Sequence, residues 1–285
     1  ADLLERGSFE EAVHGCSVVF HCASPFQISK IRDPQRELVD PAVQGTENVL
    51  DAVSGAASVS KVVLTSSVAA MYSDADECEA TPNNLFTPDR WNERSSLTHN
   101  PYSYSKTLAE RRAWELHGAQ DRWSMTAINP SFILGPPLSG RGDSTSLNTI
   151  RTMTKGLMAL GAPDLSFGVV DVRDVARAHM LAATSPETNG ERIIVSARTM
   201  SMLEMAATIE AAYPGAYRLP TRTLPKWVVW LFGPLQGADR VFVTHNVGHT
   251  LRLDNQRSLA LGLDYQSAHD TLRDQIEAMR RLRLT

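Results

Sequence analysis

The sequence predicts an α/β fold, in which helices cover both faces of a doubly wound, Rossmann-like parallel sheet, together with a smaller and mostly helical lobe. Two observations support this prediction. Over the first half of the chain, short runs of apolar and β-branched residues alternate with longer segments of helical periodicity. After residue 135 this rhythm changes, and the last third of the sequence is mostly helical in pattern.

The first half predicts three strands and two long helices. Residues 17–22 and 61–67 are apolar runs of strand length, and 123–131 is a third such run, broken by a proline near its end. Between them, residues 41–54 and 100–118 place apolar side chains three and four positions apart, which is the spacing of an amphipathic helix. The order strand–helix–strand–helix–strand is typical of parallel strands joined by helical crossovers.

The second half predicts a helix near 146–160. The segments 166–184 and 191–197 then read as a return to the α/β sheet. Further helices are expected in 198–285, because Ser201 with Glu204 makes a capping box and a helical pattern follows Pro225 and Ser267. These elements predict two units: residues 1–135 plus 166–197 as the sheet domain, and 136–165 plus 198–285 as the lobe.

Composition limits the classes of partner. The 285 residues are 42% hydrophobic and 21% charged, with a net charge of −4 and no long basic run, which argues against nucleic acid. The longest apolar run, Trp227–Phe232, is too short to cross a bilayer. We expect a buried helix there, with membrane contact or a dimer surface as the alternative. A small molecule is the expected partner, and the choice between monomer and homodimer stays open.

The cysteines and the first residues bear on the location of the protein. Cys16, Cys22 and Cys78 have neither a paired framework nor a metal-ligand spacing, so we predict no metal site and a reducing, cytoplasmic location. The opening stretch "ADLLERGSFEEAV" has no initiator Met and leads almost directly into a capped helix. We therefore expect upstream sequence, and any targeting signal within it, to be missing.

Small and polar residues follow the predicted strands. The stretches "HCASP" (21–25), "TSS" (65–67) and "NPS" (129–131) each stand at a strand end. In doubly wound sheets ligands bind outside the carboxyl ends of the strands, where small residues let a ligand approach the backbone. Each stretch alone is also ordinary turn chemistry.

The stretch "NPYSYSKTLAE" places two tyrosines next to a lysine. Asn100 is a suitable N-cap and Pro101 suits the first helical position, so the helix should begin here. Residues four apart share a helix face, whereas residues two apart lie far around the axis. Tyr102 therefore shares a face with Lys106, and Tyr104 should turn toward solvent. The shared stripe continues through Ala109 and Ala113.

This pair of residues predicts proton transfer. A tyrosine can give its proton to a developing alkoxide if a nearby cation stabilises the phenolate. Lys106 supplies that cation on the same face as Tyr102 and keeps donors for a ribose hydroxyl, and a serine hydroxyl can hold a carbonyl oxygen. A surface pair of tyrosine and lysine on a helix is the alternative interpretation.

Together with these features, several stretches resemble the extended short-chain dehydrogenase/reductases, and in particular the dihydroflavonol reductase and cinnamoyl-CoA reductase-like group. The matching stretches run along nearly the whole chain and are specific to the family, though not to a substrate: "KVVLTSS", "NPYSYSKTLAE", "NPSFILGP", "VVDVRDVARAHMLA" and "LRLDNQRSLALGL".

The resemblance implies a Rossmann-like domain that binds NADP(H), and reduction of an aldehyde or ketone. It assigns Ser67, Tyr102 and Lys106 as the catalytic residues, with Ser67 preferred over Ser66 because it immediately precedes "VAAMY". Asp171, Arg173 and His179 lie in a stretch that matches a family hallmark, and we expect them to be structural, with substrate binding as the alternative. The cofactor-binding residues that the resemblance implies are Asp2, Leu3, Ala23, Ser24, Ser66, Tyr102, Lys106, Pro130 and Ser131.

Two departures from the family pattern stand out. The family opens with a βαβ unit carrying a Gly-rich phosphate loop, and no such loop is found here, since Gly140-x-Gly142 lies in a Ser-rich segment and not between a strand and a helix. The sheet is therefore expected to be incomplete at its N-terminal side. Tyr72 stands where true dihydroflavonol reductases have Asn and cinnamoyl-CoA reductase-like members have Tyr.

Three functions are weighed. The leading interpretation is NADPH-dependent reduction of a carbonyl group, with Tyr102 as the proton donor. A sugar-nucleotide or sterol-type epimerase or dehydrogenase of the same superfamily would use the same three residues. The third possibility is a truncated, non-catalytic relative that cannot bind cofactor.

Overall fold

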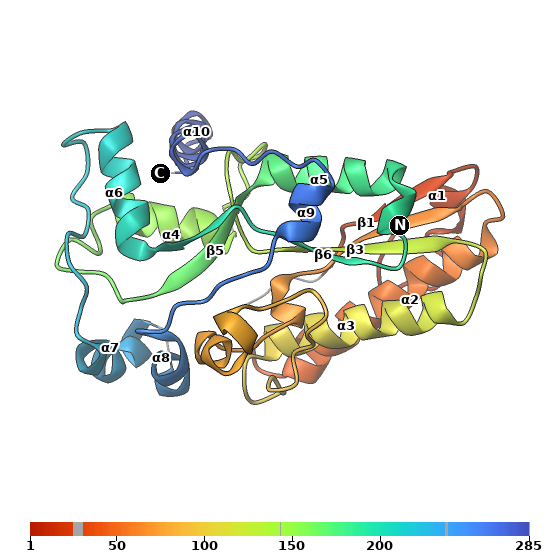
Figure 1. Ribbon diagram of the computed structural model, residues 1–285, viewed down its shortest axis with the longest axis horizontal. Coiled ribbons are helices and arrows are strands. Elements are labelled where there is room, and N and C mark those ends of the chain that lie inside the picture. The colour runs from red at the N-terminus through yellow and green to blue at the C-terminus, as the bar shows by residue number, and fades with distance from the viewer. Residues whose placement is uncertain (25–30, 143, 237–238, 285) are drawn as a thin grey trace.

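The computed structural model describes residues 1–24, 31–142, 144–236 and 239–284 (Figure 1). Its main sheet has the order β1-β2-β3-β6, and all neighbouring strands are parallel. The strands are β1 (Val18–His21), β2 (Lys61–Thr65), β3 (Ser124–Pro130) and β6 (Arg192–Val195). The three strands predicted in the first half are therefore confirmed, as is their parallel arrangement.

Helices cover both faces of this sheet. On one face α2 (Asp40–Gly55) packs against α3 (Pro101–Gly118), and on the other lie α5 (Val172–Thr184) and α9 (Gln256–Ala260) (Figure 1). Alternate residues of β2 explain why both faces are covered, because Val62 packs toward Leu50 and Val53 while Val63 packs toward α5. The doubly wound fold is confirmed.

A second, three-stranded sheet corrects one expectation. It consists of β4 (Phe132–Leu134), β5 (Ser166–Asp171) and β7 (Arg198–Ser201) in the order β4-β5-β7. The prediction that residues 166–171 return to the main sheet is wrong. β6 occupies the edge of β3, and β5 instead pairs in parallel with β4 and antiparallel with β7.

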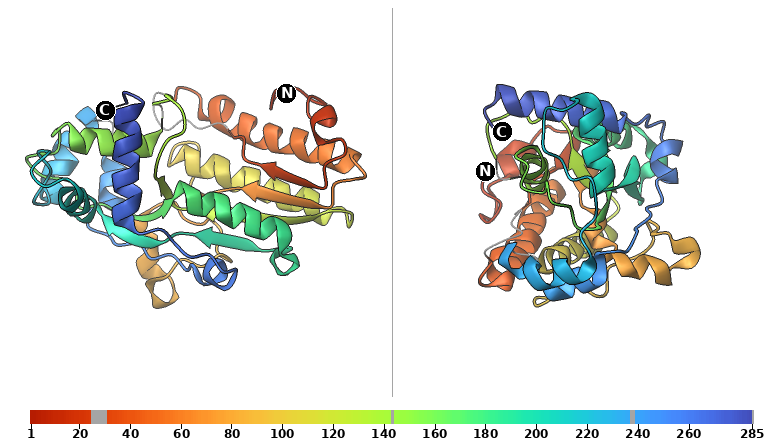
Figure 2. Two further views of the ribbon diagram at one scale, coloured as in Figure 1. Left: turned by 90° about the horizontal axis from the view of Figure 1, so that it is seen from above. Right: turned by 90° about the vertical axis from the view of Figure 1, so that its left-hand side faces the viewer.

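Helices pack around this second sheet, and together they form a separate apolar core. The helices α4 (Thr145–Thr154), α6 (Met202–Ala212) and α10 (Ala268–Arg281) lie at one end of the four-stranded sheet (Figure 2). The predicted capping box of Ser201 and Glu204 begins α6, and Ser267 caps α10. α4 ends before the predicted residue 160, because Gly156 takes a left-handed conformation with φ +73°.

The structure also corrects the expectation for the apolar run 227–232. It forms α7 (Lys226–Phe232), a seven-residue helix without a buried residue. Trp227 is 68% exposed and Phe232 is 52% exposed, so the expected buried helix is wrong. A helix of two turns that packs on α8 (Arg240–Asn246) cannot cover all its apolar side chains.

None of the helices in the described residues is long and apolar enough to cross a membrane.

Short helical segments complete the described chain. The remaining helical segments are α1 (Glu10–Val13), η1 (Gln35–Val39), η2 (Val68–Ala70), η3 (Ala75–Ala80), η4 (Pro82–Asn84), η5 (Pro186–Thr188) and η6 (Gly233–Gln236).

Candidate active site

Helix α3 presents Tyr102 and Lys106 on its inner side. Lys106 is 9% exposed, and its ammonium lies 5.9 Å from the centroid of the Tyr102 ring. Ala109 and Ala113 are buried on the same stripe, and their small side chains let the helix approach the sheet closely. On the row of Tyr104, Arg111 and Glu115 are exposed, whereas Tyr104 and Leu108 are half-buried. The shared face of Tyr102 and Lys106 is confirmed, but Tyr104 turns only partly toward solvent.

The start of α3 differs from the prediction in one respect. The helix begins at Pro101 as expected, but the Asn100 side chain makes no capping hydrogen bond. Asn100 takes a left-handed conformation, with φ 49° and ψ 57°, which turns its amide away from the helix. The amide nitrogen instead donates to the backbone carbonyl of Ser73 at 2.9 Å.

Ser67 lies against the Tyr102 hydroxyl. The chain leaves β2 at Thr65, and Ser67 then caps η2 by accepting a hydrogen bond from the Ala69 amide at 3.1 Å. Burial raises the pKa of Tyr102 to about 12, although a hydrogen bond from Ser67 acts in the opposite direction. The structure therefore brings together the three residues assigned as catalytic.

Lys106 projects into a small cavity at the carboxyl ends of β1 and β2. Burial lowers its pKa to about 8, and the nearby charge of Glu110 offsets part of this effect. Among the residues that the structure describes, none accepts a hydrogen bond from the Lys106 ammonium. The lining of the cavity consists of His21, Ala23, Ser24, Thr46, Leu64, Thr65, Ser66, Lys106, Ala109 and Glu110.

These residues suit a nucleotide cofactor. An ammonium with unused donors, small side chains at Ala23 and Ser24 and a location at strand ends match the requirements of a ribose and its phosphate. Pro25 of the predicted "HCASP" stretch lies outside the described residues.

The other residues assigned to the cofactor, Asp2, Leu3, Tyr102, Pro130 and Ser131, do not line this cavity. Leu3 packs on Gly45 of α2, where an added Cβ would come within 3.2 Å of the Leu3 side chain. Its carbonyl accepts a hydrogen bond from Asn48. Asp2 is exposed, and its carboxylate accepts from the Leu4 amide. Pro130 and Ser131 are buried where β3 ends, and the Ser131 amide donates to the Val195 carbonyl at 3.1 Å.

Sequence reasoning missed a buried carboxylate one turn beyond Lys106. Glu110 is 1% exposed and forms an ion pair with Arg192 of β6 at 2.6 Å. It also accepts hydrogen bonds from the Ser66 hydroxyl and from Asn129 of β3, at 2.8 Å in the latter case. Asn129 donates to the Ser67 carbonyl as well, at 3.1 Å. The spacing of Glu110 from Lys106, four residues along a buried stripe, was the signal in the sequence.

Trp91 and Tyr72 serve packing. The Arg192 guanidinium lies 3.8 Å from the centroid of the Trp91 ring, so that Trp91 covers the buried ion pair. Tyr72 stacks on Phe86 with ring centroids 4.5 Å apart, and burial raises its pKa above the ordinary range.

Three polar residues of the "VVDVRDVARAHMLA" stretch make contacts within the fold. Asp171 caps α5 and forms an ion pair with Arg173 at 2.7 Å. His179 hydrogen-bonds with Thr65 at the end of β2 and with the Val175 carbonyl, at 2.6 and 2.8 Å. These contacts agree with the structural role implied for the three residues.

A larger cavity lies elsewhere. It has a volume of about 260 Å³ and lies between β5 and the start of α10, with Arg198 and Tyr265 in its lining. None of the residues assigned to catalysis or to the cofactor lines it.

Comparison with known proteins agrees with this geometry. Residues 1–196 match the family model described as the NAD dependent epimerase/dehydratase family. The chain is 32% identical to cinnamoyl-CoA reductase CAD2 of Medicago truncatula, over 98% of this chain and 78% of that protein. It is 33% identical to the NADPH-dependent methylglyoxal reductase GRE2 of Saccharomyces cerevisiae, over 93% of this chain and 77% of that protein.

A solved structure extends the likeness to three dimensions. The crystal structure of the yeast methylglyoxal/isovaleraldehyde reductase Gre2 with NADPH superposes with a TM-score of 0.78 at 28% identity. This match covers 100% of the present chain and 84% of that one. The chain belongs to the NAD-dependent epimerase/dehydratase family.

Proposed function

We propose that the protein reduces an aldehyde or ketone with NADPH, and that Tyr102 is the proton donor. The observation that carries this proposal is the Ser67–Tyr102 hydrogen bond beside the buried Lys106 ammonium. The relatives support it, because one is named a cinnamoyl-CoA reductase and another an NADPH-dependent methylglyoxal reductase.

The cofactor is held by the first of two units. Residues 1–135 with 166–197 bind it, while 136–165 with 198–285 contact the substrate. When bound, NADPH supplies the hydride. Lys106 binds a ribose hydroxyl with its free donors, and Ala23 and Ser24 allow the close approach of the sugar and phosphate. The residues assigned around this position are Asp2, Leu3, Ser66, Pro130 and Ser131.

Tyr102 gives its proton to the carbonyl oxygen as negative charge develops there. With a pKa of about 12 the hydroxyl is fully protonated at neutral pH. The Lys106 cation stabilises the phenolate that remains, which lowers the cost of the transfer. Ser67 already contacts the Tyr102 hydroxyl, so a carbonyl oxygen that binds to both hydroxyls is oriented toward the proton.

A cytoplasmic location is part of the proposal and is supported by the cysteines. Cys16, Cys22 and Cys78 are unpaired, which suits the reducing cytoplasm. A small carbonyl compound is the partner, and the protein acts as a monomer or a homodimer.

The test compares two tyrosines on the same helix. Purified protein is assayed for NADPH oxidation with methylglyoxal and with cinnamoyl-CoA, and NADPH binding is measured by fluorescence. Tyr102→Phe should lower kcat about 10²- to 10⁴-fold, the range of general acid catalysis, and leave NADPH binding nearly unchanged. Tyr104→Phe removes the same hydroxyl from another helix face and should keep wild-type turnover.

Either of two results contradicts the proposal. If the wild-type protein binds no NADPH, the cofactor assignment is wrong. If Tyr102→Phe loses binding together with turnover, Tyr102 is a packing residue and another group gives the proton.

A further inference from the structure

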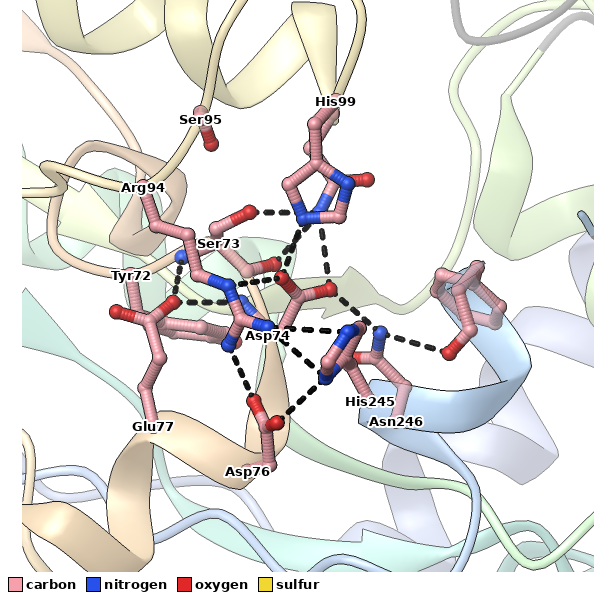
Figure 3. Close-up of polar contacts among 12 residues, drawn as sticks. Tyr72, Ser73, Asp74, Asp76, Glu77, Arg94, Ser95, His99, His245 and Asn246 are labelled. Carbon is pink, nitrogen blue, oxygen red and sulfur yellow. Dashed lines mark hydrogen bonds and ion pairs between the residues drawn. The ribbon is translucent and has the colours of Figure 1, made fainter. Parts of the chain in front are cut away.

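A second buried carboxylate lies at the start of the catalytic helix. Asp74 is 0% exposed and stands in the loop between η2, which Ser67 caps, and η3. Figure 3 shows it at the centre of a cluster of polar side chains drawn from distant parts of the sequence. Nothing in the reaction proposed above uses it directly.

Four side chains surround the Asp74 carboxylate. His99 Nε2 lies 2.6 Å from one oxygen, which Arg94 Nε also approaches to 3.5 Å. The other oxygen accepts from the amides of Asn100 at 3.2 Å and Asn246 at 2.8 Å. His99 and Asn100 immediately precede α3. Asn246 ends α8 in the C-terminal part of the chain and lies beside Asp74 (Figure 3).

The carboxylate is ionised at neutral pH. Burial alone would raise the pKa of Asp74, but the hydrogen bonds from His99 and Asn246 outweigh burial and hold the pKa below its usual value. An ionised carboxylate only accepts hydrogen bonds, so both of its oxygens are suited to these donors.

The contact with Asn100 fixes how the chain turns into α3. The Asn100 amide donates to Asp74 and to the carbonyl and hydroxyl of Ser73, while its backbone keeps a left-handed conformation. Non-glycine residues adopt that conformation at a cost, which local side-chain hydrogen bonds offset. Tyr102 follows two residues later, and Ser67 lies seven residues before Asp74 on the same segment. These hydrogen bonds of the Asn100 amide form a tether, which therefore fixes the position of Tyr102 relative to Ser67.

The contact with Asn246 adds the C-terminal part of the chain. Asn246 donates to Asp74 and accepts from the Ala75 amide at 3.0 Å, so that its side chain is held at both ends. A neighbouring contact, His245 Nδ1 with Asp76 at 2.6 Å, joins the same helix to the same loop. Asp76 also pairs with Arg94 at 2.7 Å, and among the described residues it has no hydrogen bond with Asn100, so Asp76→Asn disturbs the same cluster but leaves the Asn100 contact in place.

We propose that Asp74 is a positioning residue of the reductase, which holds the N-terminus of α3 through Asn100 and links the docking of α8 to the placement of Tyr102 against Ser67. This proposal rests on the function proposed above. Asp74 acts through Asn100 and does not touch the reacting atoms.

The first experiment compares Asp74→Asn with Asp76→Asn by steady-state kinetics with NADPH and methylglyoxal. Asp74→Asn should lower kcat about tenfold to a hundredfold, because a small misplacement of a catalytic group has effects of that size. Its KM for NADPH should stay within about twofold, since the cavity around Lys106 is untouched. Asp76→Asn should keep kcat within about twofold.

The second experiment separates positioning from a general loss of structure. In a Tyr102→Phe background the proton donor is absent, so Asp74→Asn should change the residual rate by less than about twofold while lowering Tm by the same amount as in wild type. An equal loss of rate in both backgrounds would show that Asp74 only stabilises the fold, and would overturn the proposal. Wild-type kcat in Asp74→Asn would overturn it as well.

A third variant keeps the test valid if Asp74→Asn does not fold. Asn100→Gly retains the left-handed backbone, which glycine adopts freely, and removes only the amide tether. It should show the same drop in kcat and the same lack of effect in the Tyr102→Phe background. Failure of the proposed function is a separate result, because it would appear as wild-type turnover in Tyr102→Phe itself.

Discussion

Two buried carboxylates hold helix α3, and their partners differ. Glu110 faces Arg192, Asn129, Ser66 and Trp114, which lie on α3 itself or on and just beyond strands β2, β3 and β6. Asp74 faces His99, Arg94 and two amides, and one of those amides comes from α8. The first carboxylate thus belongs to the sheet domain, and the second connects that domain to the C-terminal part of the chain.

The difference lies in which parts of the molecule each cluster joins. The Glu110 carboxylate pairs with the Arg192 guanidinium, which is always charged, and all of its named partners belong to α3 or to the four-stranded sheet and its strand ends. The Asp74 carboxylate is approached by Arg94 and His99 and also accepts from Asn246, so its cluster depends on the position of α8. Lys106 lies one turn before Glu110, and Tyr102 lies two residues after Asn100 of the Asp74 cluster.

The largest expected effect comes from neutralising the Glu110 carboxylate. Glu110→Gln leaves Arg192 buried without its counter-charge, and removing one partner of such a pair costs about 3–5 kcal/mol of unfolding free energy. Asp74→Asn should cost less, because Arg94 is partly exposed and keeps its ion pair with Asp76. Denaturant unfolding measures both variants, with Glu115→Gln on the exposed side of α3 as control. A larger loss in Asp74→Asn than in Glu110→Gln would reverse the comparison.

An intermediate effect is expected at acid pH. Burial, followed by the charge of Lys106, lowers the pKa of His21 to about 4 from 6.5. The folded state therefore holds fewer protons than the unfolded state between these values, and stability falls as pH drops from about 6.5 to about 4. A shift of this size corresponds to about 3 kcal/mol in total.

His21→Gln should flatten the pH dependence of the unfolding free energy in that window, while His14→Gln on the exposed surface should not. The Asp74 cluster responds at lower pH, because the depressed pKa of Asp74 keeps its contribution until pH falls below about 4. Asp74→Asn should therefore change only the lower part of the curve. If both variants changed the unfolding free energy in the same pH range, His21 and the Asp74 cluster would titrate together.

The smallest effect concerns the pH dependence of kcat/KM at alkaline pH. With the pKa of Lys106 at about 8, kcat/KM for NADPH should fall about tenfold per pH unit above that value. Lys106→Arg, whose charge persists, should move the decline to higher pH. Glu110→Gln should move it to lower pH, because the Glu110 charge raises the pKa of Lys106. A decline that stays in place in both variants would assign it to another group.

Much of the fold and of the site could be predicted from local patterns. The spacing of Tyr102 and Lys106 fixed the inner face of α3, and strand-length apolar runs located β1, β2 and β3. These features depend on periodicity within one element, which a single sequence contains.

Contacts between distant segments could not be predicted in this way. The Asn100 amide is an ordinary cap by residue type, yet Ser73 and Asp74 compete for it. The register that puts Arg192 beside Glu110 follows from the β3–β6 pairing, which no local pattern encodes. β5 was assigned to the wrong sheet for the same reason, since its partners β4 and β7 are chosen by the tertiary fold.

The way the chain alternates between the two sheets has a consequence for protein engineering. β3 and β4 are consecutive strands in different sheets, with only Ser131 between them, and β6 and β7 are separated by only two residues, Ser196 and Ala197. The second sheet is thus assembled from three separate stretches of sequence. A chimera that takes this second sheet from a relative therefore needs several coordinated crossovers at these junctions, because no single continuous segment of sequence contains the whole sheet.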